Sequence, residues 1–155
     1  MRIAIAAIGR LGRAPEAALA EDYARRATAA GRALGLGPVE ILEIEAREAM
    51  TWPCSSQAIT SSPGPSAASS ASASAAFPGL RAFAGQIGAL RDGGTRRLVY
   101  LIGGSDGLGE AALDRAGRKL AFGPQTWPHA LARAMLAEQV YRAATILAGS
   151  PYHRD

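Results

Sequence analysis

The sequence predicts an α/β fold in which a mostly parallel sheet is flanked by helices. Short apolar segments rich in Ile, Leu and Val alternate with longer segments whose apolar residues recur at helical spacing. Glycine and proline mark many boundaries between the two kinds of segment. A chain of 155 residues suits one domain with one hydrophobic core. We therefore expect a single domain over residues 1–155.

Two strands and one helix are expected before the middle of the chain. Residues 2–8 are rich in isoleucine and predict a buried strand. A helix should begin near Pro15, which a first helical turn tolerates, and continue to about Leu34. Gly35 and the glycine and proline that follow it end this helix. The apolar and acidic residues of 39–45 (VEILEIE) indicate a second strand.

The segment from Thr51 to Leu80 differs from the rest of the chain. It contains no charged residue, although 19% of the whole chain is charged. Ser, Ala and Pro dominate it, which is typical of a low-complexity, loosely held loop. A structureless loop of this length is uncommon inside a compact domain. We therefore treat residues 51–80 as an anomalous segment of the single domain.

Helices and strands alternate again after this segment. The expected elements are a helix over residues 80–91, a buried strand over 97–102, a glycine-rich loop over 103–109, a short helix over 110–117, a strand over 119–122 and a long helix over 128–147. Glu110 in the first turn of the short helix suits the helix dipole, and Pro128 suits the start of the long one.

The composition limits the possible functions. The net charge of +4 favours an anionic partner such as nucleic acid, although a basic solvated surface gives the same value. Nearly all the positive charge is arginine, which binds phosphate in a bidentate manner; a GC-rich genome also produces arginine. Cys54 is the only cysteine, so an internal disulfide or a multi-cysteine zinc site is excluded. The apolar start is too short for a signal peptide, and no stretch approaches the roughly 20 apolar residues of a membrane span. We expect a cytoplasmic protein with no membrane partner and no metal.

Three features of the last third of the chain could carry chemistry. The glycines of 103–109 are either a ligand-binding loop or an ordinary turn, since no complete nucleotide-binding motif is present. The helix after Pro128 has a broad apolar surface for the core or for a subunit interface, and its Glu138 and Arg142 lie four residues apart on one face. The terminal residues 152–154 combine base stacking, proton transfer and phosphate binding. The sequence lacks the Gly-x-Ser-x-Gly turn of a serine hydrolase.

These motifs resemble one known family. The strand and loop LIGGSDGL, the helix TWPHALARAMLAEQVYRA and the closing PYHR are similar to the ribosomal RNA large-subunit methyltransferase H family of the SPOUT class. The resemblance is close over residues 98–154 and looser over the first strand and VEILEIE. The joint occurrence of LIGG, T-x-PH, AEQ-x-YRA and PYHR makes it specific.

The resemblance implies a SPOUT-type α/β fold with a trefoil knot near the C-terminus, and a homodimer. It also implies methylation of N3 of a pseudouridine in 23S ribosomal RNA, on the ribosome, with S-adenosyl-L-methionine as the cofactor. The implied cofactor-binding residues are Leu101, Gly103, Gly104, Gly123, Pro124, Gln125, Thr126, Trp127 and Pro128. The implied catalytic residues are His129, Glu138, Arg142, Tyr152, His153 and Arg154, and the implied RNA-binding residues are Arg133, Arg142 and Arg154. The C-terminal tail of one subunit would complete the site of its partner.

Two other functions remain open on the same residues. One is a relic that binds ribosomal RNA but has an impaired cofactor site because of the anomalous segment. The other is a SPOUT methyltransferase that acts on a different RNA. Binding of the cofactor separates the first from an enzyme, and the identity of the methylated RNA separates the second.

The anomalous segment is also a departure from the family pattern. Family members usually have a strand there that ends in a Leu-Asp-type turn with charged residues. We hypothesise that residues 50–79 are translated from a shifted reading frame, because all charge is lost abruptly while the overall length is kept. A divergent loop is the alternative. Resequencing the gene and translating its other frames decides between them, and the hypothesis fails if no frame restores a charged, strand-like stretch.

Overall fold

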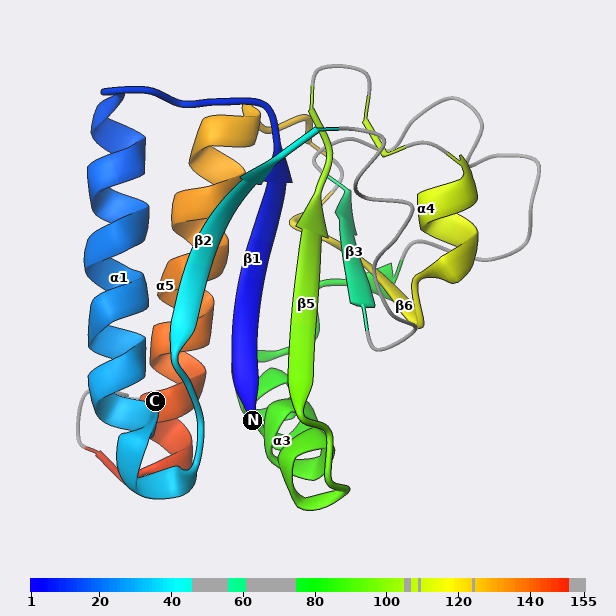
Figure 1. Ribbon diagram of the computed structural model, residues 1–155. Coiled ribbons are helices and arrows are strands. Elements are labelled where there is room, and N and C mark those ends of the chain that lie inside the picture. The colour runs from blue at the N-terminus through cyan, green and yellow to red at the C-terminus, as the bar shows by residue number, and fades with distance from the viewer. Residues whose placement is uncertain (46–55, 61–74, 105–106, 109, 124, 151–155) are drawn as a thin grey trace.

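The structure of this chain is a computed structural model that describes residues 1–45, 56–60, 75–104, 107–108, 110–123 and 125–150. Strands and helices alternate along these residues (Figure 1). In chain order they are β1 (Arg2–Ile8), α1 (Pro15–Gly31), the 3₁₀ helix η1 (Arg32–Leu34), β2 (Val39–Ile44), β3 (Ser56–Thr60), β4 (Ala75–Ala76), α3 (Leu80–Asp92), β5 (Arg97–Ile102), α4 (Glu110–Arg115), β6 (Arg118–Ala121) and α5 (His129–Leu147).

The strands form one sheet with the order β2-β1-β5-β3-β6-β4. Every pairing between these strands is parallel. In the register of the three strands at one side, Ile5 of β1 lies between Ile41 of β2 and Tyr100 of β5. The predicted α/β class with a mostly parallel sheet is therefore confirmed. The knot stays a prediction, because the loops that would form it include residues outside the described part of the chain.

The expected elements occur with small shifts at their ends. The predicted strand over 119–122 begins one residue earlier, at Arg118, and the short helix expected to reach Gly117 ends at Arg115. The first long helix ends at Gly31 and is followed by η1, where Gly35 adopts a left-handed conformation. Such shifts are ordinary, because helix and strand ends depend on capping contacts that a periodic pattern does not contain.

The prediction of a loosely held loop over the whole of residues 51–80 is wrong for two stretches. β3 lies inside the sheet, between β5 and β6, and β4 pairs with the outer edge of β6. Backbone hydrogen bonds from two neighbouring strands outweigh the composition, because strand propensity depends strongly on context and spans only about 1 kcal/mol per residue. The other residues of this segment before Phe77 lie outside the described part of the chain.

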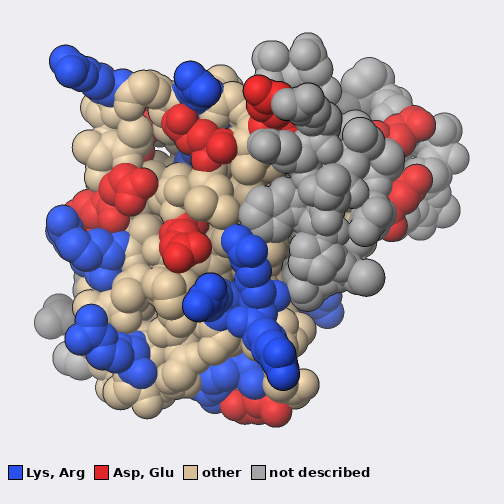
Figure 2. Space-filling view, in the orientation of Figure 1, with Lys and Arg blue, Asp and Glu red and all other residues tan. Residues whose placement is uncertain are grey.

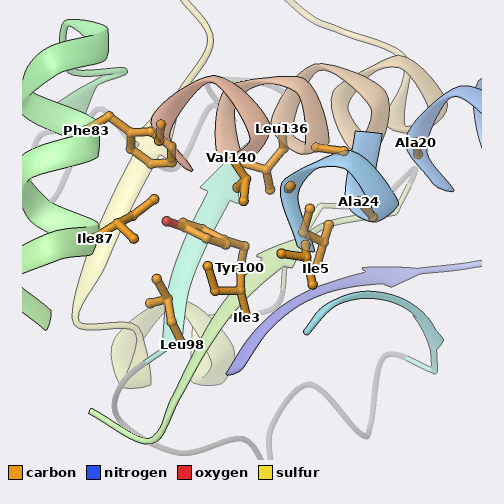
Figure 3. Packing of buried hydrophobic residues seen from close by; sticks show 14 of the residues in the cluster. Ile3, Ile5, Ala20, Ala24, Phe83, Ile87, Leu98, Tyr100, Leu136 and Val140 are labelled. Carbon is orange, nitrogen blue, oxygen red and sulfur yellow. The ribbon is translucent and has the colours of Figure 1, made fainter. Parts of the chain in front are cut away.

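The sheet separates two hydrophobic clusters. On one face the side chains of β1 and β5 pack with α1, α3 and α5, and Figure 3 shows Tyr100 of β5 close to Phe83 and Ile87 of α3. On the other face a smaller cluster joins Ala4, Ala6, Val99 and Leu101 to Leu108 and Ala112. The alternation of the side chains along a strand produces this division, since successive residues point to opposite faces.

The two long helices α1 and α5 lie side by side against the larger cluster (Figure 1). Their shared surface uses alanine: Ala20, Ala24 and Ala27 of α1 are buried, as are Ala137 and Ala144 of α5. Small side chains let the two helix backbones approach closely. This packing holds α5, which carries four of the predicted site residues, firmly on the sheet.

Candidate active site

After β1 and after β5 the chain continues toward opposite edges of the sheet. The chain leaves β1 toward β2, at one edge of the sheet, and leaves β5 toward β6, on the other side. In open parallel sheets, ligands bind outside the carboxyl ends of the strands at such a switch point. The loop after β1 and the glycine loop after β5 both begin there, so this edge is the candidate site.

The glycine loop after β5 folds back on itself. The Gly107 N–H donates to the Gly104 carbonyl over 3.0 Å, and these two residues form an isolated antiparallel bridge. A Cβ on Gly103 would lie 2.6 Å from the carbonyl carbon of Gly107, so no side chain fits at that position. The loop therefore presents closely packed backbone at the end of β5. Leu101 directs its own side chain into the smaller core cluster.

The second predicted cofactor loop follows β6. Gly123 has a φ of +93°, and a Cβ on it would lie 2.9 Å from the Gln125 side-chain oxygen. The Trp127 Nε1–H donates to the Phe122 carbonyl over 3.0 Å and so closes this loop. Gln125 and Thr126 are exposed, and Trp127 is half-buried. Pro128, also exposed, occupies the position before the first residue of α5, whereas Pro124 lies outside the described residues.

Glu138 and Arg142 of α5 form an ion pair. Arg142 Nε donates to Glu138 Oε1 over 2.8 Å, and its second nitrogen lies 2.6 Å from the same oxygen. Gln139 donates to the other carboxylate oxygen over 2.6 Å. The Glu138 side chain is 15% exposed and that of Arg142 is 40% exposed, so the pair lies at the surface of the helix. The spacing of four residues produced this contact, as the sequence predicted.

The structure does not bring His129 together with this ion pair within one chain. His129 is the first residue of α5, beside the loop that follows β6, and is half-buried. Glu138 is nine residues further along a straight helix, which places it about 13 Å away along the axis and on the opposite side. Tyr152, His153 and Arg154 lie outside the described residues.

Arg133 is fully buried, at 0% relative exposure. Its Nη2 donates to the carbonyls of Ile8 and Gly9, at 3.0 and 2.8 Å. Burial lowers the pKa of its guanidinium, and the nearby Glu43 carboxylate opposes that shift. A side chain in this position cannot reach an RNA phosphate without leaving the two carbonyls. The role in RNA binding expected for Arg133 stays a prediction, and it would require the side chain to leave these carbonyls.

Glu43 is a residue of this site that the sequence did not indicate. Its Oε1 accepts the Leu11 N–H over 2.8 Å and lies 3.5 Å from Arg133 Nη1. In the pattern of VEILEIE it resembled any acidic residue on the solvent side of a strand. An arginine within an alanine-rich, otherwise apolar helical stretch was the only signal of an unusual environment.

The geometry suits a ligand that is held largely by backbone groups. Two glycine-containing loops close on themselves at the carboxyl ends of β5 and β6, where a nucleoside can approach the main chain. Within the described residues there is no group of three or more His, Cys, Asp or Glu side chains that could hold a metal ion. Among the same residues, none of the helices has the length and apolar character required to cross a membrane.

Comparison with known proteins agrees with this geometry. The family described as "Predicted SPOUT methyltransferase" matches residues 1–153. The chain is 59% identical over 155 residues to a "Ribosomal RNA large subunit methyltransferase H" of Phenylobacterium zucineum, with all of both chains covered. It is 57% identical over 172 residues to a relative with the same name from a Caulobacter species, and 45% identical over 157 residues to one from Maricaulis maris; all of both chains is covered in each case. The chain therefore belongs to the SPOUT methyltransferase family.

Proposed function

We propose that the protein transfers a methyl group from S-adenosyl-L-methionine to N3 of a pseudouridine in 23S ribosomal RNA. The observation that carries this proposal is the full-length similarity to relatives named for methylation of large-subunit ribosomal RNA. The two backbone-lined loops at the carboxyl edge of the sheet support it, since they offer a place for the cofactor. The protein would act in the cytoplasm, where ribosomes are found.

The cofactor would be held by Gly103 and Gly104 on one side and by residues 123–128 on the other. When bound, it supplies a methyl group already activated by the sulfonium. The protein then has to orient the two reactants and exclude water. The close backbone packing of Gly103 against Gly107 supports this role, because the two glycines hold each other in place.

The reaction also requires removal of a proton from the imide nitrogen of the base. Glu138 or His153 is our candidate for accepting it, and Arg142 or Arg154 for stabilising the negative charge that develops on the neighbouring oxygen. The ion pair of Glu138 with Arg142 supports a joint role, since the arginine holds the carboxylate in one orientation. Tyr152 would stack on the base after it has left the helix of the RNA.

The surface charge supports an RNA partner. β1, β5 and β6 each begin with an arginine, and Arg2 lies opposite Arg97 in the register of the sheet. Figure 2 shows basic side chains gathered over this end of the strands. Such clusters attract the phosphate backbone without reading its sequence. Contacts to bases would come from the opposite edge, where the proposed site lies.

A homodimer explains why His129 and the Glu138–Arg142 pair lie on opposite sides of α5. The exposed face that includes Leu131, 38% exposed, also carries Glu138 and Arg142, so a second copy could pack on it. The tail of that copy would then bring His153 and Arg154 to the site. In this arrangement each methyl-transfer site contains residues from both subunits.

Calorimetric titration of the purified protein with S-adenosyl-L-methionine is the first test of this function. Saturable binding near one site per chain or per dimer is expected, followed by methylation of ribosomes that lack the modification. A folded protein that does not bind the cofactor but binds ribosomal RNA would be a relic with an impaired cofactor site. Methylation of another RNA in preference to 23S ribosomal RNA would identify the other alternative.

Substitutions in the tail test the assignment of the catalytic residues. The variants His153→Ala and Arg154→Ala should bind the cofactor normally, because the loops after β5 and β6 are intact. They should methylate ribosomes far more slowly, since the proton acceptor or the stabilising charge is missing. Wild-type rates in both variants would remove the tail from the proposed site.

A further inference from the structure

The guanidinium of Arg133 is buried without a full set of hydrogen-bond partners in the part of the chain that the structure describes. Its side chain has no exposed surface, and its Nε and Nη1 find no hydrogen-bond partner among the described residues. Burying a charge that is incompletely paired opposes folding. A buried charge that is incompletely paired is expected where the residue serves a function. Stability alone therefore does not explain this arginine.

The hydrogen bonds of Arg133 go to the last residue of β1 and to the first residue of the loop that follows it. Nη2 binds the carbonyls of Ile8 and Gly9, and Nη1 lies at ion-pair distance from Glu43, too far for a hydrogen bond. Glu43 in turn accepts the Leu11 N–H. One side chain from α5 and one from β2 thus hold three backbone groups of the segment from Ile8 to Leu11.

The loop held in this way borders the proposed cofactor site. It begins at the carboxyl end of β1, next to β5 and its glycine loop. Gly104 packs against Ile8, because a Cβ on Gly104 would lie 3.2 Å from Cγ2 of Ile8. The Ile8 carbonyl bound by Arg133 belongs to the same residue. A direct line of contacts therefore runs from α5 through β1 to the glycine loop.

We infer that Arg133 and Glu43 are positioning residues, which fix the loop after β1 as a wall of the methyl-transfer site and support the glycine loop through Ile8. The inference rests on the proposed function. It assigns to Arg133 an action through the backbone rather than direct contact with RNA. Neither residue needs to touch the cofactor or the base.

The variant Arg133→Met tests this inference most directly. Methionine is unbranched and adaptable, so it can occupy apolar space while removing the charge and both hydrogen bonds. Gly9 is exposed and Ile8 is half-buried, so we expect water to reach the carbonyls that the substitution releases. The fold should therefore persist. Arg133→Lys retains the charge with one short donor group, and Glu43→Gln removes only the carboxylate charge.

Glu40→Gln is the matched control for Glu43→Gln. Glu40 is an exposed residue of the same strand, three positions earlier, where the side chain points to the opposite face of the sheet. The substitution makes the same change of charge. Its effect on the site should be nil, because no described contact of Glu40 reaches the loop after β1.

Three measurements on each variant distinguish positioning from a purely structural role. Calorimetry should show that Arg133→Met weakens binding of S-adenosyl-L-methionine by about 3- to 30-fold. The rate of methyl transfer at saturating cofactor should fall by roughly 10- to 100-fold, since small misplacements have effects of that size. Amide hydrogen exchange over residues 8–14 should become faster in Arg133→Met and Glu43→Gln, whereas the melting temperature should change little. Arg133→Lys should lie between the wild type and Arg133→Met.

Other outcomes separate this inference from the proposed function. If the wild type binds the cofactor and Arg133→Met binds it equally well at the wild-type rate of transfer, the positioning role is wrong. A large fall in melting temperature in both Arg133→Met and Arg133→Lys, without a change in affinity or rate, would make Arg133 a structural residue only. If the wild type itself fails to bind the cofactor or to methylate RNA, the proposed function fails, and this inference fails with it.

Discussion

Tyr100 illustrates how a single polar atom affects the stability of this fold. Its ring packs at 5.9 Å from that of Phe83, between β5 and α3. Its hydroxyl is buried and has no hydrogen-bond partner among the described residues. Burial raises the pKa of this hydroxyl above its ordinary value. An unpartnered buried hydroxyl costs free energy, so the aromatic ring stabilises the protein while the oxygen opposes folding.

We predict that Tyr100→Phe raises the free energy of unfolding by roughly 1 kcal/mol at neutral pH, because the unsatisfied hydroxyl is removed. The benefit should grow at alkaline pH. In the unfolded wild type the Tyr100 hydroxyl ionises near pH 10, whereas in the folded protein it keeps its proton. The free energy of unfolding therefore falls as the pH rises above about 10. Chemical denaturation at pH 7 and pH 10.5 measures both effects. Tyr23→Phe, at a half-buried ring, is the control, and equal behaviour of the two variants would contradict the prediction.

At the scale of the elements, the connection between β5 and α4 contains a close approach of two glycines. Gly103 lies against the backbone of Gly107, and Gly107 adopts a φ of +77°. Backbone atoms cannot move aside as a flexible side chain can. Position 103 therefore requires glycine, because any side chain there would meet the backbone of Gly107.

We predict that Gly103→Ala weakens binding of S-adenosyl-L-methionine at least about tenfold, because the new methyl group displaces the loop. Calorimetry measures the affinity, and circular dichroism verifies that the sheet persists. Gly85→Ala is the matched control: nothing lies within 4 Å of a Cβ there, and the residue is in helix α3. That control should raise the stability by about 0.5–1 kcal/mol and leave the affinity unchanged. Unaltered affinity in Gly103→Ala would show that this loop does not hold the cofactor.

At the scale of the whole molecule, charge and assembly decide how a small domain acts on a ribosome. The net charge of +4 is carried mainly by arginine, and part of it lies at the amino ends of the strands, opposite the site. β1 has seven residues, so this basic end lies about 20 Å from the glycine loop. RNA bound at the site could extend along the sheet to reach it.

Binding to ribosomal RNA should therefore weaken steeply with salt. For each phosphate neutralised, the logarithm of the affinity should fall by about 0.7–0.9 per tenfold increase in salt. Filter binding between 50 and 200 mM salt measures the slope, and the double substitution Arg2→Gln with Arg118→Gln should reduce it. Arg25→Gln is the control, because Arg25 pairs with Asp22 on α1. An affinity that does not change with salt would exclude phosphate contacts as its source.

Mixing two inactive variants tests whether each site contains residues of both subunits. Glu138→Gln and His153→Ala should each lose most methyl-transfer activity. In a mixed dimer of the two, one site would carry both substitutions and the other neither. Random exchange of subunits should then restore about a quarter of the wild-type activity. If mixing restores nothing although exchange is complete, the tail and the ion pair of each site come from the same chain.

The sequence alone determined which segments form the main strands and helices. Apolar runs rich in Ile and Leu mark β1 and β5, the alternating VEILEIE marks β2, and apolar residues at helical spacing mark α1, α3 and α5, because these patterns are local. The motifs from LIGG to PYHR likewise identified the family, since they are contiguous stretches of residues. The Glu138–Arg142 pair followed from the helix pitch alone.

The remaining features depend on contacts between parts of the chain that are far apart in the sequence. β3 acquires its conformation from the neighbouring strands β5 and β6, although its composition indicates a loop. Arg133 acquires its role from carbonyls 124 and 125 residues away in the sequence, a contact that no helical pattern contains. The packing of α5 in the fold determines what His129 and Glu138 can reach from opposite sides of that helix. Local patterns determine the elements, whereas burial and long-range hydrogen bonds determine which of their side chains can act together.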